Sequence, residues 1–243
     1  MKMEIQAHRI LAISAVRDEE KSIGRVIEQL KQIGLSDIAI VDDGSTDGTS
    51  EILQAHGITV LRSGAREGLG MAARSLFQYA RHHQFEVVVT LAGNGKDDPM
   101  QIPRLLQPLL EEGYDLVQGS RYLPGGSYTN MPFYRWLGTR LIYPLLFFLV
   151  TGRWMTDATN GFRAFRMSLF DDPRINLHQD WLSQYEMEPY ILYKAVTLGY
   201  KVKEVPVSKT YPKRGEEYTK MKPITGWWSI LRPLVLLGLR IKR

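Results

Sequence analysis

Two loops of this 243-residue chain carry side chains that could act on a charged ligand. The first, "VDDGSTDGT" (41–49), places Asp42 and Asp43 next to each other at the end of an apolar run. Adjacent carboxylates repel each other unless a donor-rich ligand or a nearby base compensates them. The second, "LAGNGKDDP" (91–99), follows the apolar run "EVVVT" and combines Lys96 with two aspartates. Its composition fits either an ordinary turn or an altered metal site.

Alternating strand and helix signals surround both loops. Near-continuous apolar runs predict strands at residues 8–16, 37–45, 58–63, 85–93, 114–121 and 200–208. Helical spacing of apolar residues predicts helices at residues 21–34, 47–57, 68–83, 99–113 and 185–199. This alternation predicts an α/β fold with a mostly parallel sheet and helices on both faces. In such sheets ligands bind at the carboxyl ends of the strands, which favours the loops that follow residues 15, 42, 91 and 118.

The composition is that of a globular protein with an anionic partner. Hydrophobic residues make up 44% and charged residues 23% of the chain, and the net charge is +5. A basic excess suits phosphates, acidic lipid or nucleic acid, but the basic tail has no base-reading module, so nucleic acid is not expected. The chain has no cysteine, which excludes disulfides and thiolate metal sites. Its N-terminus has no apolar signal region, so we expect a cytoplasmic location.

Two apolar segments indicate contact with a membrane surface. The run "LIYPLLFFLV" (141–150) is too short to span a bilayer, which needs about 20 apolar residues. It is either plain core or an apolar shelf beside the active site. The C-terminal segment combines Trp227 and Trp228 with terminal basic residues, as in helices that lie in an anionic lipid interface. We therefore expect a main domain over residues 1–222 and an amphipathic, membrane-associated tail over residues 223–243.

Several motifs also have a purely structural interpretation. Ser45 or Asp47 could cap the helix that follows the first loop. The motif "GLGMAA" (68–73) fits a dinucleotide-binding pattern but follows the third strand, so we interpret its glycines as close packing at a helix start. The acids of "VRDEE" could favour a helix N-terminus, which accounts for Glu20 better than for Arg17.

Five motifs together resemble glycosyltransferase family two with its GT-A, Rossmann-like fold. They are "VRDEEKSIGRVI", "IVDDGSTDGT", "REGLGMAARS", "VQGSRY" and "TDATNGFRAF", in the order and spacing of the family. The sequence resembles in particular dolichol-phosphate mannosyltransferases and bacterial polyprenyl-phosphate glycosyltransferases, over about residues 8 to 222. The resemblance implies an inverting transfer of a sugar from a nucleoside diphosphate-sugar to a polyprenyl phosphate on the cytoplasmic membrane face.

The resemblance also implies which residues bind the nucleotide-sugar. Val41 and Asp43 match the residues that hold the base and the ribose. Only Glu19 survives from the family's first motif, Pro-x-Tyr-Asn-Glu, because Ala15, Arg17 and Asp18 stand at its other three defined positions. Arg214 and Lys220 match two basic residues of a loop that closes over the phosphates. By itself, the segment around them has the composition of a solvated loop with mixed charges. The full set is Ala15, Arg17, Glu19, Val41, Asp43, Gly93, Asn94, Arg214 and Lys220.

A second set, implied in the same way, faces the phosphates and the acceptor. Arg121 matches an arginine that faces the donor and acceptor phosphates, for which the fork of a guanidinium is well suited. Arg135 and Thr139 match residues that meet the lipid phosphate, and their spacing of four places them on one helix face. Asp157 is assigned to orient the acceptor region.

The acids that hold a metal ion in the family are missing from the second loop. Alignment on Pro99 puts Ala92 and Asn94 in place of Asp-x-Asp, and Lys96 in place of a further neutral ligand. Mg²⁺ or Mn²⁺ prefers several carboxylate oxygens, and an ammonium group would repel the ion by about 4 kcal/mol at 4 Å with an effective dielectric near 20. Asn94 therefore offers a weak metal site. We hypothesise that Lys96, with Arg121 and the two bases of the closing loop, replaces the ion electrostatically.

Two further acids and two rival functions complete the expectations. Asp97 and Asp98 rescue a metal site only if the loop turns them inward, and Asp98 is expected to cap a helix. Transfer to a sugar or glycolipid hydroxyl would need a base, for which Asp157 or Glu188 is a candidate. A degenerate sugar-nucleotide binder would have lost catalysis together with its metal acids.

The resemblance also assigns Gly161 and Arg163 to the floor of the site.

Overall fold

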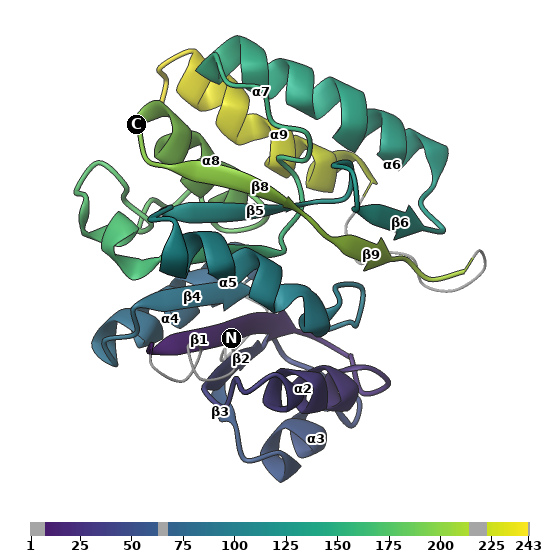
Figure 1. Cartoon of the computed structure of the whole chain (residues 1–243). Helices are drawn as coiled ribbons and strands as arrows, with labels where there is room; N and C mark the ends of the chain where they lie inside the picture. Colours follow the sequence, from purple (N-terminus) through teal and green to yellow (C-terminus); the bar gives the residue numbers. More distant parts are fainter. Residues whose placement is uncertain (1–7, 63–67, 214–222, 243) are drawn as a thin grey trace.

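A seven-stranded sheet forms the centre of the molecule (Figure 1). The computed structural model describes residues 8–62, 68–213 and 223–242. The strands lie in the order β3-β2-β1-β4-β7-β5-β8, and β7 is antiparallel to both of its neighbours. Their bounds are β1 (Ile10–Val16), β2 (Ile38–Asp42), β3 (Thr59–Arg62), β4 (Val87–Thr90), β5 (Leu116–Ser120), β7 (Arg163–Arg166) and β8 (Val202–Pro206). The predicted mostly parallel α/β sheet is confirmed.

Helices cover both faces of this sheet because alternate strand residues are buried on opposite sides. In β1, Ile10 and Ala12 join one apolar core, whereas Leu11 and Ile13 join the other. The first core is closed by α2 (Ile23–Gln32), α3 (Thr49–Ala55) and α5 (Ile102–Glu111). The second is closed by α4 (Leu69–His82) and α8 (Met187–Thr197) together with two further helices.

Those two helices form a separate layer beside α8 (Figure 1). One is a continuous helical rod made of α6 (Phe133–Leu137), the π-helical turn η2 (Gly138–Ile142) and α7 (Tyr143–Thr151). The other is α9 (Pro223–Gly238), whose Leu234 and Leu237 are buried in the same core as α7 and α8. Within the described residues, no helix is long and apolar enough to cross a bilayer.

Short elements complete the fold at both ends of the sheet. Strands β6 (Ser127–Thr129) and β9 (Ser208–Thr210) form a two-stranded parallel sheet. Two 3₁₀ helices, η1 (Pro99–Gln101) and η3 (Met167–Asp171), follow β4 and β7. The apolar-run criterion does not predict β7, because this strand begins and ends on an arginine. It does not predict β6 either, because all three of its residues are exposed.

The glycines of "GLGMAA" serve close packing at the start of α4, as predicted. A Cβ atom on Gly70 would lie 2.3 Å from the Leu182 carbonyl oxygen. Gly68 has a φ of 94°, and a Cβ there would lie 2.6 Å from the Gln184 amide nitrogen. Such distances are shorter than any van der Waals contact, so the segment around residue 183 can pack only on a bare backbone.

Candidate active site

A cavity of about 810 Å³ opens at the carboxyl ends of β1, β2, β4 and β5, and residues from all four loops favoured by the sequence line it. Among the residues assigned to the nucleotide-sugar, the phosphates and the acceptor, five line it: Glu19, Asn94, Lys96, Arg121 and Arg135. Seven others lie outside its lining: Ala15, Arg17, Val41, Asp43, Gly93, Thr139 and Asp157. Arg214 and Lys220 lie outside the residues that the structure describes.

The loops after β1 and β2 are locked together at one end of this cavity. Asp18 has a positive φ of 52°, and its N–H donates a 3.0 Å hydrogen bond to Ser45 Oγ. Its carboxylate in turn accepts from the Thr46 N–H at 2.7 Å. The Glu19 N–H donates to Thr49 Oγ1 at 2.8 Å. This exchange fixes Glu19 at the cavity wall.

The two adjacent aspartates of "VDDGSTDGT" have different surroundings. Asp42 is buried and accepts hydrogen bonds from the Ser45 N–H, at 2.9 Å, and from the Ser50 hydroxyl. These donors compensate its charge. Asp43 is half-buried, and its N–H donates to the Val16 carbonyl at 2.9 Å, which extends the β1–β2 pairing by one residue. Ala15 and Val41 face each other in that pairing.

The predicted helix caps in this loop are wrong by position. The N-cap of α3 is Gly48, not Ser45 or Asp47. The loop continues for six residues after β2, and side chains outside the cap position satisfy the first N–H groups of the helix. Asp47 accepts from the Thr49 N–H and Glu20 accepts from the Gly48 N–H, both at 3.0 Å. Glu20 thus supports the N-terminus of a helix, as predicted for its motif. The helix is α3, which follows the other loop.

The loop after β4 turns one of its two aspartates inward. Asp97 is buried, and its carboxylate accepts from the Ala92 N–H at 2.9 Å and pairs with Lys209 Nζ at 2.6 Å. Asp98 caps η1 by accepting from the Met100 N–H at 3.0 Å, which confirms its predicted role. A Cβ atom on Gly93 would lie 2.3 Å from Val16 Cγ1, so the loop crosses β1 where only glycine fits.

Lys96 lies on the cavity wall in a cationic environment. Burial lowers the pKa of its ammonium group from 10.5 to about 8, and the nearby charges of Lys209 and Arg135 contribute to this shift. Glu19 and Asp97 act in the opposite direction but do not cancel it. An anion in the cavity would relieve this repulsion. The position therefore favours a negatively charged ligand.

The loop does not fit a divalent ion. Ala92 has no ligand atom, and the Asn94 amide oxygen already accepts from the Lys96 N–H at 3.2 Å. The inward acid, Asp97, is held by Lys209. Across residues 8–62, 68–213 and 223–242, no group of three or more His, Cys, Asp or Glu could hold a metal. The residues present carry their own positive charges instead.

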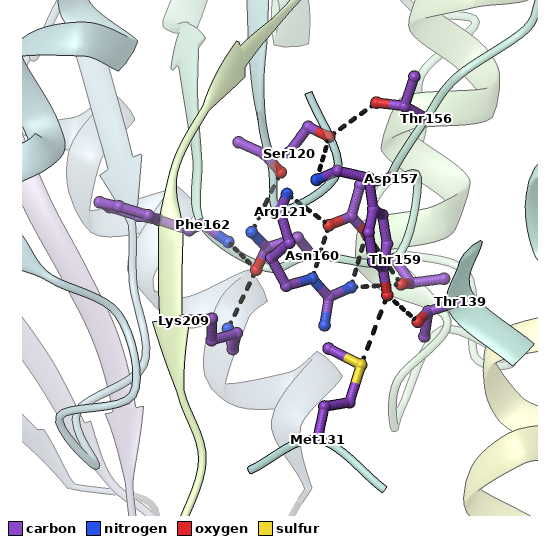
Figure 2. A network of polar contacts seen from close by, with 12 residues as sticks. Ser120, Arg121, Met131, Thr139, Thr156, Asp157, Thr159, Asn160, Phe162 and Lys209 are labelled. Atoms are coloured by element: carbon purple, nitrogen blue, oxygen red, sulfur yellow. Dashed lines mark hydrogen bonds and ion pairs between the residues drawn. The ribbon is translucent and has the colours of Figure 1, made fainter. Parts of the chain in front are cut away.

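Arg121 forms an ion pair with the buried acid Asp157 (Figure 2). Its Nε and Nη2 donate to the two carboxylate oxygens of Asp157, each at 2.6 Å. Further donors reach Tyr211 and Thr159. Burial opposes the charge, but Asp157 outweighs it and holds the pKa of Arg121 above its ordinary value. The guanidinium fork expected to grip phosphate is thus occupied by Asp157, and of its five N–H donors one remains for a ligand.

A half-buried acid orders the segment that carries Asp157. Glu204 on β8 accepts hydrogen bonds at 2.8 Å from the Thr156 N–H, the Thr156 hydroxyl and the Asp157 N–H. Burial raises the pKa of its carboxyl group, and these donors oppose that rise. Ser120 also contacts Thr156, at 2.7 Å between their hydroxyl oxygens. β8 thereby determines the position of Asp157, and through it that of Arg121.

Arg135 and Thr139 lie on one helix, but only Arg135 reaches the cavity. The guanidinium of Arg135 stacks on the Tyr211 ring at 5.3 Å. Thr139 is buried; its hydroxyl donates to the Arg135 carbonyl at 2.8 Å and lies 2.6 Å from the Tyr122 hydroxyl. In this structure Thr139 contacts the backbone that carries Arg135 and not the cavity.

Gly161 and Arg163, which the resemblance assigns to the floor of the site, both line the cavity. Arg163 is fully buried and donates to the carbonyls of Asn160, Ala158 and Glu188. A Cβ atom on Gly161 would lie 2.9 Å from a Glu188 carboxylate oxygen, so this acid closes over bare backbone. The motif reasoning does not identify three other lining residues, Tyr185, Lys209 and Tyr211, which no recognised motif contains.

A mostly parallel sheet with helices on both faces and a charged cavity at the carboxyl ends of its strands has the arrangement of a GT-A fold. The chain belongs to glycosyltransferase family 2, since the model of that family, described as "Glycosyl transferase family 2", matches residues 12–172. It is a glycosyltransferase. The expected family and fold are both confirmed.

Two similar proteins have names that describe transfer of a sugar to a lipid phosphate. The undecaprenyl-phosphate mannosyltransferase of Micrococcus luteus is 30% identical over 218 residues, which cover 86% of this chain and 86% of that protein. The dolichyl-phosphate hexose transferase of Haloferax volcanii is 28% identical over 228 residues, which cover 93% and 92%. Among solved structures, glucosyl-3-phosphoglycerate synthase of Mycobacterium tuberculosis with Mn²⁺ and UDP has a TM-score of 0.72 at 18% identity, covering 100% of this chain and 84% of that one. This last likeness shows the fold.

Proposed function

We propose that this enzyme moves a sugar from a nucleoside diphosphate-sugar to a polyprenyl phosphate at a membrane surface, with inversion and without a divalent ion. One observation carries the proposal: the cationic end of the cavity is bounded by the helical layer whose outer side is apolar and exposed. Arg135 of α6 and Ile230 of α9 both line the cavity. A phosphate on a hydrocarbon chain needs this combination of neighbouring surfaces.

The outer side of the helical layer supports a membrane-bound acceptor. Leu141, Leu145 and Leu149 are spaced by four residues and are 52%, 47% and 69% exposed. Phe133, at the start of the same rod, is 73% exposed, and Trp228 of α9 is 52% exposed. An exposed apolar stripe of this extent is typical of a surface that lies in a lipid interface.

The cations support a phosphate acceptor and a diphosphate leaving group. In the proposed reaction, an acceptor phosphate oxygen forms a bond to the anomeric carbon. The bond from that carbon to the β-phosphate oxygen breaks, and the nucleoside diphosphate leaves with the electron pair. An acceptor phosphate is ionised at neutral pH, so the step needs positioning and charge stabilisation and no strong general base. Lys96 stabilises the negative charge that grows on the leaving group.

The acidic end of the cavity supports a sugar-nucleotide. Glu19 lines the cavity and accepts hydrogen bonds from the nucleoside. Asp43, which follows β2 and lies half-buried outside the cavity lining, accepts hydrogen bonds from the same nucleoside. Carboxylates are suited to hydroxyl and N–H donors because an ionised carboxylate only accepts hydrogen bonds.

A second candidate, transfer to a sugar or glycolipid hydroxyl, has one supporting observation. Glu188 lines the cavity and could serve as the base that such an acceptor requires. Asp157, the other candidate base, has its carboxylate committed to Arg121.

One experiment separates these functions. The purified protein is incubated with GDP- and UDP-sugars and with either undecaprenyl phosphate or a lipid-linked sugar, each with and without EDTA, and products are detected by mass. We expect a polyprenyl phosphosugar at an equal rate with EDTA. A product formed only on the hydroxyl acceptor would support the second candidate. Activity lost with EDTA and restored by Mg²⁺ or Mn²⁺ would contradict metal independence.

A further inference from the structure

The ion pair between Lys209 and Asp97 joins two segments that are 112 residues apart at the wall of the cavity. Lys209 lies on β9, and β9 also fixes the backbone of the loop: the Thr210 N–H donates to the Lys96 carbonyl at 2.9 Å. The Lys209 side chain is 11% exposed and that of Asp97 is 1% exposed. Lys209 therefore lies beside Lys96 in the part of the site where the family places its metal acids.

We propose that Lys209 binds the diphosphate of the sugar donor directly and forms, with Lys96, a pair of ammonium groups in place of the divalent ion. This inference rests on the proposed function for the identity of the donor, but not on the identity of the acceptor. Lys209 lies outside every motif that the sequence indicates.

The hydrogen bonds of Lys209 leave room for a ligand. Its ammonium group donates to Asp97 Oδ1 at 2.6 Å and to Asn160 Oδ1 at 3.0 Å (Figure 2 shows the second bond). An ammonium group has three N–H donors, so one remains. Because Lys209 lines the cavity, that donor is within reach of a ligand there.

The charges explain why two ammonium groups tolerate each other at this wall. Lys209 acts on Lys96 strongly enough to contribute to its lowered pKa. Asp97 cancels one of the two positive charges and holds its partner in place, so the pair keeps one net positive charge before a ligand binds. A diphosphate adds the missing negative charge, and both ammonium groups are then compensated.

Asp97 gives the proposal a sharp test, because the two readings of the pair predict opposite results. If the pair only holds the loop, Asp97→Asn and Lys209→Met weaken the site alike. If Lys209 contacts the ligand, Lys209→Met weakens binding, whereas Asp97→Asn leaves it equal or tighter because a negative charge is removed. The asparagine side chain still offers an oxygen to the Ala92 N–H, so this loop contact is retained.

Binding of UDP, GDP and inorganic pyrophosphate is measured by calorimetry in EDTA. We expect Lys209→Met to lower the affinity for all three about ten- to a hundredfold, as for the loss of one charged hydrogen bond. Lys209→Arg should restore most of it. Lys203→Met is the matched control, since Lys203 also pairs with an acid at 2.6 Å, Glu112, but on the exposed surface. Its affinity should equal that of the unaltered enzyme.

Folding is controlled with the double variant Asp97→Asn/Lys209→Met, which leaves no buried charge without a partner. We expect it to melt cooperatively and to bind as weakly as Lys209→Met. Equal losses in Asp97→Asn and Lys209→Met, or unchanged binding in the double variant, would overturn the proposal. No acceptor is present, so these results are independent of whether the enzyme glycosylates a lipid phosphate or a hydroxyl.

Discussion

Lys96 should make donor use depend on pH in a way that a metal ion would not. With a pKa of about 8, its ammonium group is about 90% protonated at pH 7 and about 10% protonated at pH 9. Because kcat/KM reports the free enzyme, we expect it to fall above pH 8 by about tenfold per unit. The decrease in kcat/KM should level off once Lys96 is fully neutral. At that point the enzyme has lost one charged hydrogen bond, which corresponds to a kcat/KM about ten- to a hundredfold below the plateau at pH 7.

The comparison of kcat with kcat/KM identifies the group. A bound diphosphate favours the ammonium form, so it raises the pKa of Lys96 and moves the fall in kcat to higher pH. Lys96→Arg keeps its charge throughout and should show no fall between pH 7 and about 9.5. Lys96→Met should be low and flat. A level kcat/KM profile in the unaltered enzyme, or the same fall in Lys96→Arg, would refute the reasoning.

Loss of folding cannot imitate this profile through Lys96 itself. Its pKa is lower in the folded protein than the ordinary 10.5 of an unfolded chain. Between about pH 8 and 10.5 the unfolded state therefore binds more protons, and the contribution of Lys96 to the free energy of unfolding rises with pH. Activity and this contribution to stability thus change in opposite directions, and urea unfolding at pH 7 and pH 9 serves as the control.

Three further predictions concern the elements around the site. Glu204→Gln should lower the free energy of unfolding by about 1–3 kcal/mol and reduce kcat, because a half-buried acceptor of three hydrogen bonds is replaced. Urea unfolding and initial rates measure this, and unchanged values would contradict the role of Glu204. Phe133→Ser with Leu149→Ser should reduce sedimentation with anionic vesicles while leaving the melting temperature unchanged, since both side chains are exposed; equal sedimentation would argue against the apolar stripe as the lipid contact. Gly70→Ala should cost about 1–3 kcal/mol of stability, because its Cβ would lie 2.3 Å from a carbonyl oxygen, and an unaltered melting temperature would show that the backbone can yield.

The parts of the fold that the sequence predicts are those whose cause is local. Six of the seven sheet strands are apolar runs, and their ends mark the loops that form the cavity. The sequence does not predict β7, because Arg163 and Arg166 donate hydrogen bonds to backbone carbonyls of residues distant in sequence. The sequence does not identify Lys209 as a site residue for the same reason, since its partner Asp97 is distant in sequence. Pattern and spacing report neighbours along the chain, whereas these contacts follow from sheet order.

The same distinction changes how two predicted acids are interpreted. Asp157 is assigned by the resemblance to the acceptor region, yet its carboxylate is bound by Arg121 and its backbone by Glu204. Its effect on a ligand would pass through Arg121, so it is a positioning residue in this structure. Asp98 behaves as its neighbours along the chain predict and caps η1. A buried acid is thus explained by its partners, and an exposed one by its place in the sequence.

The charge arrangement of the loop after β4 has a consequence for the conditions under which the enzyme works. A divalent ion keeps its charge across the physiological pH range but must be supplied and can be removed by a chelator. Lys96 and Lys209 belong to the chain and cannot be removed, but the ammonium group of Lys96 loses its proton near pH 8. In the proposed mechanism, replacing metal acids with lysines exchanges a dependence on metal for a dependence on pH. Asp97 limits that dependence, since it favours the protonated form of Lys96 and holds Lys209 beside it.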